Sequence, residues 1–158
     1  MSLHNLSYVC SHLKNCSMAR VPITSVQYTK LHLALVLGLY RHGVISHVQL
    51  GSRNGPDLNP VPISNENISS RRLWVTLKYN NAEPVIKSAI LESKPSRKKT
   101  MKLPALKRLI EGYWAESTKP LDPGDLLFLR TDKGILEARE AVELQRGGQL
   151  LCRFTSLR

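Results

Sequence analysis

The chain has 158 residues, of which 42% are hydrophobic, and a formal net charge of +11. This length allows one ordinary domain or two small ones that share an interface, and no apolar run approaches the roughly 20 residues that span a bilayer. Three cysteines, Cys10, Cys16 and Cys152, are too few for a disulfide scaffold and indicate a reducing compartment. The excess of positive charge favours nucleic acid as the partner over anionic lipid or acidic protein.

The first 56 residues contain no Asp or Glu, and the first acidic residue is Asp57. A basic, acid-free N-terminus is typical of mitochondrial import signals. It is also typical of a surface that lies against RNA, from which an acid would be repelled. The two interpretations are compatible, and we expect an uncleaved signal with a mature chain that starts at residue 1 or 2.

Apolar residues recur at helical spacing over residues 3–15 and predict a short amphipathic helix. β-Forming residues over 20–26 predict a strand. Thr29 is the expected N-cap of a second helix, and Gly43 is its expected stop. A further strand is predicted over residues 44–50.

Residues 51–70 are polar and rich in Gly, Pro and Asn, and they predict a long loop or insertion. Residues 71–80 alternate in polarity and predict a strand. One face of it would carry Leu73, Val75, Leu77 and Tyr79, and the other Trp74, Thr76 and Lys78. A turn at Asn80-Asn81 and a strand over 85–93 follow.

The residues Lys94-Pro95-Ser96 predict a hinge between two units. The elements expected beyond it are a helix over 104–112, a strand over 126–130, a turn at 132–134, a helix over 137–145 stopped by Gly147-Gly148, and a strand over 150–154. The predicted fold class is α/β (α+β). Residues 1–93 would form an αβαβββ unit, and residues 94–158 a mostly β unit with two short helices.

Few residues indicate a catalytic or metal-binding role. His12 and Cys16 could share one helix face near Cys10, but no second ligand pair follows, so a packing role is favoured over zinc. The other histidines, His32, His42 and His47, are expected to face solvent or phosphate. The acids Glu137, Glu140 and Glu143 are expected to form a solvated helix face. Because no P-loop, GxGxxG or GxSxG motif occurs, we expect no enzyme, no cofactor, no metal and no small-molecule substrate.

The segment 94–108 is the strongest sign of function, because it is rich in Lys and Arg, contains no Asp or Glu, and is expected to have no acid nearby. It carries Lys94, Arg97, Lys98, Lys99, Lys102, Lys107 and Arg108, and Arg71-Arg72 form a second basic pair. Such residues neutralise phosphates and release counterions.

The turn Thr131-Asp132-Lys133-Gly134 presents a hydroxyl, backbone amides and a cation together, a set suited to ribose and unstacked bases. The alternative is that this segment is only a hairpin turn.

Several segments, taken together and in order, resemble one known family, the small-subunit ribosomal protein eight family of bacteria and organelles. They are the start of the second helix at Thr29-Lys30-Leu31, the strand Leu73 to Tyr79, Ser93-Lys94-Pro95, Lys102-Leu103-Pro104, Thr131 to Ala141, and Gly147 to Cys152. The chain departs from the family pattern at Ser96, Arg130 and Asp132. The insertion 51–70, the long connection 113–125 and the segment 69–79 look most like the fungal mitochondrial form.

The resemblance implies a two-domain α/β fold and a structural role in the small subunit of the mitochondrial ribosome, in the mitochondrial matrix. It implies binding to the central domain of small-subunit rRNA during platform assembly, with neighbouring ribosomal proteins as further partners. Together, resemblance and charge predict RNA contacts at Lys30, Arg71, Arg72, Lys94, Arg97, Lys98, Lys99, Arg130, Thr131, Asp132, Lys133 and Gly134. The alternatives are a non-ribosomal RNA-binding module and an enzyme acting on RNA.

Overall fold

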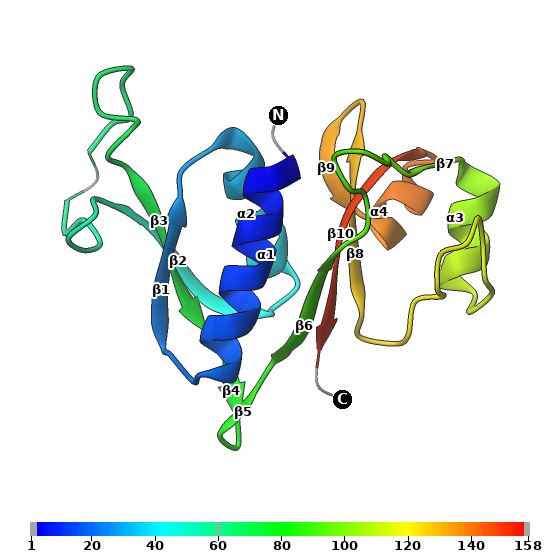
Figure 1. Cartoon of the computed structure of the whole chain (residues 1–158), viewed down its shortest axis with the longest axis horizontal. Helices are drawn as coiled ribbons and strands as arrows, with labels where there is room; N and C mark the ends of the chain where they lie inside the picture. Colours follow the sequence, from blue (N-terminus) through cyan, green and yellow to red (C-terminus); the bar gives the residue numbers. More distant parts are fainter. Residues whose placement is uncertain (1–2, 60, 157–158) are drawn as a thin grey trace.

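The computed structural model describes residues 3–59 and 61–156. Met1 and Ser2, where the mature chain is expected to start, lie outside this range, as do Pro60, Leu157 and Arg158. The elements form four layers (Figure 1). A small sheet is followed by a pair of helices, then by a larger sheet, and finally by two short helices. The mixed α/β class predicted from the sequence is confirmed.

The N-terminal sheet has the order β1-β3-β2, and both pairings are antiparallel. Its strands are β1 (Ile23–Gln27), β2 (Ile45–Gly51) and β3 (Arg72–Leu77). Burial alternates along β3, where Leu73, Val75 and Leu77 are buried, as the sequence predicts. This face of the sheet packs on α1 (Leu3–Met18) and α2 (Lys30–Arg41).

Helix α2 begins where the sequence predicts. The Thr29 side chain accepts a hydrogen bond from the backbone N–H of His32 at 3.0 Å, so Thr29 is the N-cap. Gly43 follows the helix with φ +70°, a conformation that favours glycine. Helix α1 continues three residues beyond the expected end at Asn15, and Arg20 takes the left-handed conformation after it.

The C-terminal sheet has the order β6-β10-β8-β9, with β7 also paired to β10. Its strands are β6 (Ile86–Leu91), β7 (Thr100–Met101), β8 (Leu126–Thr131), β9 (Gly134–Glu137) and β10 (Gly148–Ser156). Strand β6 precedes the boundary expected at residue 93, yet it is hydrogen-bonded to β10. The fourth and last strand of the expected αβαβββ unit therefore joins the second sheet.

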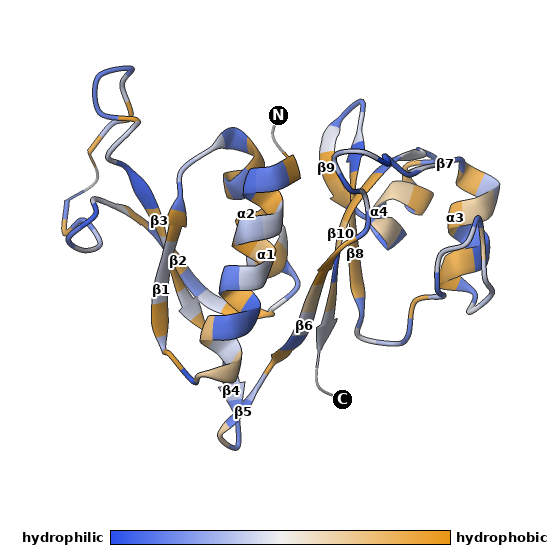
Figure 2. Ribbon diagram, viewed as in Figure 1, coloured by the Kyte–Doolittle hydropathy of each residue, from blue (hydrophilic) through white to orange (hydrophobic). Residues whose placement is uncertain are grey.

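Strand β8 is covered on both faces, because the larger sheet lies between two helical layers. Phe128 faces the core that contains α1 and α2, whereas Leu127 and Leu129 face a second core. The second core is completed by α3 (Leu103–Ile110) and α4 (Ala138–Glu143). Figure 2 shows hydrophobic residues along these central strands and on the facing sides of the helices.

Three details of the expected elements are wrong. The strand expected over 71–80 ends at Leu77, and a short hairpin follows, formed by β4 (Tyr79–Asn80) and β5 (Glu83–Pro84). Strand β9 lies where only a turn and a helix start were expected. Helix α4 ends at Glu143, with Leu144 as its C-cap and Gln145 at φ +53°, so the glycine pair 147–148 does not stop it.

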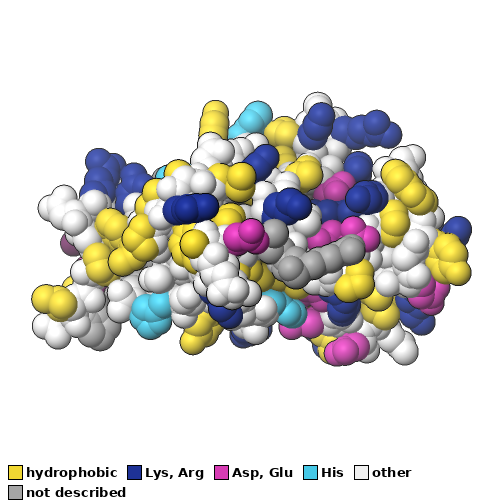
Figure 3. Space-filling model, turned by 90° about the horizontal axis from the view of Figure 1, so that it is seen from below, with side chains coloured by type: hydrophobic (Ala, Val, Ile, Leu, Met, Phe, Trp, Pro, Cys, Tyr) yellow, Lys and Arg dark blue, Asp and Glu magenta, His cyan; other side chains and the backbone are white. Residues whose placement is uncertain are grey.

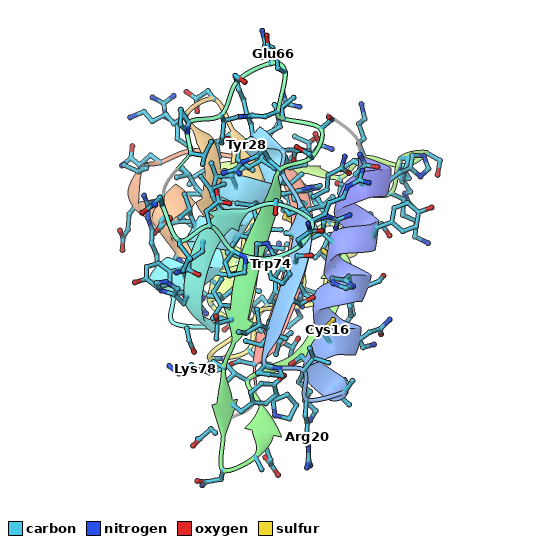
Figure 4. The ribbon with its side chains drawn as sticks, turned by 90° about the vertical axis from the view of Figure 1, so that its left-hand side faces the viewer. Cys16, Arg20, Tyr28, Glu66, Trp74 and Lys78 are labelled. Carbon is cyan, nitrogen blue, oxygen red and sulfur yellow. The ribbon has the colours of Figure 1, made fainter. Side chains whose placement is uncertain are left out.

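The 51–70 segment is a long loop, as the sequence predicts, and it is tied to the outer face of β3 (Figure 4). The indole N–H of Trp74 donates to the Ser52 carbonyl at 2.9 Å. The Arg71 guanidinium pairs with the Asp57 carboxylate and also donates to the Val61 carbonyl at 3.3 Å. Within the described residues, no helix is both long and apolar enough to cross a membrane.

Candidate nucleic-acid interface

Strand pairing brings the basic segment and the 131–134 turn to one end of the C-terminal sheet. Gln149 on β10 is paired with Thr100 of β7 on one side and with Arg130 of β8 on the other. Residues 94–99 immediately precede β7, and the 131–134 turn joins β8 to β9. Both segments lie at the upper end of this sheet in Figure 1. Segments more than 30 positions apart in the chain are thus neighbours at one edge.

Residues 94–99, where the sequence predicts a hinge, form a closed turn. Lys94 and Arg97 exchange two backbone hydrogen bonds of 3.1 and 3.0 Å. The buried Ser93 hydroxyl accepts from the Lys99 backbone N–H at 2.9 Å and lies 3.3 Å from the Lys99 carbonyl. These bonds hold the exposed side chains of Lys94, Arg97 and Lys98 at the surface.

Lys99 differs from its neighbours. Its ammonium lies 3.0 Å from a carboxylate oxygen of Glu92, and the other oxygen lies 3.4 Å from Arg153 Nε. The Glu92 and Arg153 side chains are largely buried. The expectation that no acid lies near Lys99 is therefore wrong, because the fold places the end of β6 beside it. Lys99 is engaged within the protein, whereas Arg97 and Lys98 form no ion pair among the described residues.

The 131–134 turn is a tight reversal that depends on glycine. Gly134 has φ +116°, which confirms the expected positive φ and which other residues rarely adopt. The Thr131 hydroxyl donates to the Gly134 carbonyl at 3.0 Å and accepts from the Lys133 N–H at 3.3 Å. Lys133 and Gly134 are exposed. The hydroxyl therefore closes its own turn, and both of its hydrogen bonds lie at the exposed surface.

Two arginines border the turn. Arg130 is exposed at the end of β8. Arg146, which the sequence interpretation did not single out, lies 3.1 Å from the Asp132 carboxylate. Asp132, a departure from the family pattern, is thereby partly neutralised at the surface. No local sequence signal marks Arg146, because 13 residues separate it from Asp132 along the chain.

The glycine pair 147–148 permits close packing beneath this edge. A Cβ at Gly147 would lie 2.5 Å from the Met101 carbonyl oxygen, and one at Gly148 would clash with the Arg130 carbonyl oxygen. Only glycine allows β10 to begin between these two segments. The pair therefore joins the basic segment to the turn, and does not serve as the helix stop that the sequence predicts.

The other predicted RNA contacts lie elsewhere. Lys30 is exposed at the first residue of α2. Only 5% of the surface of Arg71 is exposed, so Arg71 does not have the exposed position that an RNA contact needs. Arg72 is half-buried and lines a groove of about 440 Å³ between α1 and β1, together with Tyr8 and His12.

The histidines and acids also depart from expectation. His32 is buried and its Nδ1 lies 2.9 Å from the Gln27 carbonyl, so Nδ1 carries the proton and donates. Burial lowers the pKa of His32. Glu137 is buried and caps α4 in a reciprocal capping box with Glu140, so the predicted solvated acidic face is wrong for Glu137.

His12 and Cys16 do lie together on α1, as their spacing predicts. His12 Nε2 is 2.6 Å from the Thr24 hydroxyl and 3.6 Å from Cys16 Sγ. Across the described part of the chain, no group of three or more His, Cys, Asp or Glu side chains could hold a metal ion. The pair is accounted for by contacts between α1 and β1.

A family model for ribosomal protein S8 matches residues 4–154. The chain is 44% identical to the small ribosomal subunit protein uS8m of Neurospora crassa, over 97% of this chain and 99% of that one. It is 35% identical to the protein of the same name in Schizosaccharomyces pombe, with the same coverage. It is 28% identical to the bacterial uS8 of Dictyoglomus thermophilum, over 89% of this chain and 88% of that protein. The chain belongs to the ribosomal protein S8 family, whose members are structural and not enzymatic.

Proposed function

We propose that this chain is a structural component of the small subunit of the mitochondrial ribosome and binds small-subunit rRNA through the end of its C-terminal sheet. The two relatives of highest identity named above are fungal uS8m proteins matched over nearly their whole length. The rRNA contacts are made by Lys94, Arg97, Lys98, Arg130, Thr131, Lys133 and Gly134, which the sheet gathers at one edge.

One observation carries the proposal, namely the pairing of Gln149 with both Thr100 and Arg130. It sets a run of exposed cations beside a rigid turn. The cations supply affinity that depends on phosphate and salt. The turn supplies backbone groups and a shape that structured RNA can match. We further propose that the chain binds the central domain of small-subunit rRNA and supports assembly of the platform region of the small subunit.

The test is binding of the full chain to a transcript of the mitochondrial small-subunit rRNA central domain, compared with an unrelated RNA of equal length. Replacing Arg130 and Lys133 by Gln should weaken binding to the cognate transcript. Replacing Lys14 and Lys87 by Gln is the matched control, because it removes the same charge from α1 and from the opposite end of the C-terminal sheet. Equal losses with both pairs would show that net charge alone drives binding.

Sedimentation of mitochondrial lysate separates this role from a non-ribosomal one. The ribosomal role requires co-migration of the endogenous chain with small subunits. A chain that remains free of subunits would instead fit an RNA-processing or regulatory module. A chain that cleaves RNA in a nuclease assay would overturn the structural role.

The N-terminus bears on import. Helix α1 places Leu6, Leu13 and other apolar side chains in the core, so its removal would expose that core. We therefore keep the proposal that this segment is retained in the mature protein. Mass spectrometry of the mature chain tests it, and a start beyond about residue 16 would overturn it.

A further inference from the structure

Tyr113 and Trp114 are two consecutive aromatic residues that remain at the surface, with 62% and 64% of their areas exposed. They follow α3, which lies in the layer farthest from the N-terminal sheet (Figure 1). Within the described residues, neither ring has an aromatic contact or a side-chain hydrogen bond. In Figure 3 the right-hand end of the molecule carries hydrophobic, basic and acidic side chains close together.

The backbone that carries the two rings is rigid. The Tyr113 N–H donates to the Arg108 carbonyl at 2.9 Å, and Gly112 takes φ +93° to make this reversal. Ala115 and Thr118 are paired, with Glu116 and Ser117 in left-handed conformations between them, as in a tight hairpin turn.

The hairpin is also fixed to the core from below. Ala115, Thr118 and Leu121 are buried, with 6%, 2% and 4% of their areas exposed, and the Leu121 N–H donates to the Leu109 carbonyl at 3.0 Å. Burial of one side of the hairpin holds Tyr113 and Trp114 on the other side. Two rings held in this way lose little conformational entropy when a ligand covers them.

The surroundings of the rings indicate which ligand covers them. Lys107 and Arg108 are exposed in the last turn of α3, next to Tyr113. The exposed residues that flank the rings in the chain are Glu111, Gly112, Glu116, Ser117 and Lys119. A protein interface has an apolar centre, and no exposed aliphatic residue flanks these rings in the chain. Exposed aromatic rings beside Arg are the arrangement on which unpaired bases stack.

We propose that Tyr113 and Trp114 form a stacking platform for unpaired nucleotides of RNA, separate from the edge that carries the 131–134 turn. This inference rests on the proposed function only in taking RNA as the partner of the chain. Local charges nearly cancel, with Lys107, Arg108 and Lys119 against Glu111 and Glu116. Stacking on the rings therefore supplies most of the affinity at this site. Because few cations are available to neutralise phosphates, the salt dependence of binding here should be shallower than at the 131–134 turn.

The probe for the test is a single-stranded oligoadenylate RNA of 12 nucleotides. The chain has two tryptophans, so Trp74→Phe leaves Trp114 as the sole tryptophan reporter. Addition of the probe should quench Trp114 fluorescence. Anisotropy of labelled probe should show roughly tenfold weaker binding for Trp114→Ala, the order expected for loss of one stacked base. Trp114→Phe should keep most of the affinity because it keeps a ring.

Tyr40→Ala is the matched control, because it removes another exposed aromatic residue, 48% exposed on α2. It should leave probe binding unchanged. The stacking platform is overturned if the oligoadenylate binds Trp114→Ala as tightly as the parent chain and does not quench Trp114 in the Trp74→Phe chain. If the Trp114→Ala chain no longer assembles into small subunits but still binds the oligoadenylate as the parent does, the stacking platform is also overturned. The two rings would then contact a protein.

The outcomes for the platform and for the sheet edge are distinguishable. If Trp114→Ala binds the oligoadenylate normally while the Arg130 and Lys133 variants bind the cognate transcript more weakly, the proposed function holds and the stacking platform does not. If the Arg130 and Lys133 variants bind the transcript normally while Trp114→Ala binds the oligoadenylate more weakly, the stacking platform is supported. The proposed rRNA contact at the end of the C-terminal sheet is then refuted.

Discussion

The Thr131 hydroxyl donates a hydrogen bond to the carbonyl oxygen of Gly134, 3.0 Å away, and so closes the turn that projects from β8 and β9. Thr131→Val keeps the size and branching of the side chain but removes this bond and the one from Lys133. We expect a loss of about 1 kcal/mol in the free energy of unfolding, measured by denaturant titration. Cognate RNA affinity should fall with it, because the turn loses its shape.

Thr131→Ser is the control for this change, because it keeps the hydroxyl. It should retain both the stability and the affinity of the parent chain. If Thr131→Val keeps full stability, the two turn bonds contribute nothing measurable. A loss of affinity without any loss of stability would instead assign the hydroxyl a direct contact with RNA.

The ion pair between Arg71 and Asp57 fastens the 51–70 loop to β3. The Arg71 side chain is 6% exposed and that of Asp57 is 16% exposed. Arg71→Gln leaves a largely buried carboxylate without its cation, so we expect a loss of about 3 kcal/mol in unfolding free energy. Proteolysis within residues 51–70 should also become faster, which limited digestion followed by mass spectrometry will detect.

Arg72→Gln is the matched control, since Arg72 is half-buried and forms no ion pair among the described residues. It should change stability little. An Arg71→Gln chain that is as stable and as protease-resistant as the parent would show that the loop is held by other contacts, such as the bond from Trp74 to Ser52.

Arg97 and Lys98 are expected to act on RNA, and Lys99 mainly on the protein. Arg97→Gln with Lys98→Gln should flatten the log-log salt dependence of rRNA binding by up to about 1.5 units, with little change in stability. Lys99→Gln should instead lower stability, because Glu92 loses one of its two cations. Filter binding at several salt concentrations, together with thermal unfolding, separates the two effects. The reverse pattern would refute this division of roles.

Burial of His32 links stability to pH. Its pKa is lowered in the folded chain from an ordinary value of 6.5, with desolvation as the main cause. Below about pH 6.5 the unfolded chain takes up a proton at His32 that the folded chain does not. Stability therefore falls as the pH drops from about 6.5 towards the folded pKa, and is fully retained above 6.5.

His32→Asn removes this titration while keeping a donor towards the Gln27 carbonyl. It should reduce the slope of unfolding free energy against pH below about pH 6.5. An equal slope in the parent and the His32 variant would contradict this assignment.

Gly38 in α2 lies against the ring of Phe128 in β8. A Cβ at Gly38 would be 2.6 Å from Phe128 Cε1, and Phe128 is held edge-on to Phe154 and His42. Gly38→Ala should therefore destabilise the fold by about 1–3 kcal/mol, despite a helix propensity gain of up to about 1 kcal/mol. Gly55→Ala, where a Cβ meets nothing within 4 Å, should be nearly neutral. Chemical denaturation of both variants decides the point.

The spacing of apolar residues and the positions of capping and turn residues predicted most of the helices and strands. The alternation of Leu73, Val75 and Leu77 predicted β3 and its buried face, and Thr29 predicted the start of α2. These signals are local, because a strand alternates every two residues and a helix cap acts within three. The same local signals misassigned Gly147-Gly148, since glycine marks a helix stop and a close backbone approach equally well.

The sequence by itself determined the fold class, the family, the basic character of residues 94–108 and the tight turn at Gly134, because each depends on composition or on neighbours within a few residues. Only the tertiary structure decided which charges are free. It buried Arg71 against Asp57, joined Lys99 to Glu92, and placed Arg97 and Lys98 beside Arg130 through the pairing of β7, β10 and β8. Ion pairs between distant segments depend on strand register, and register is set by packing across the whole sheet.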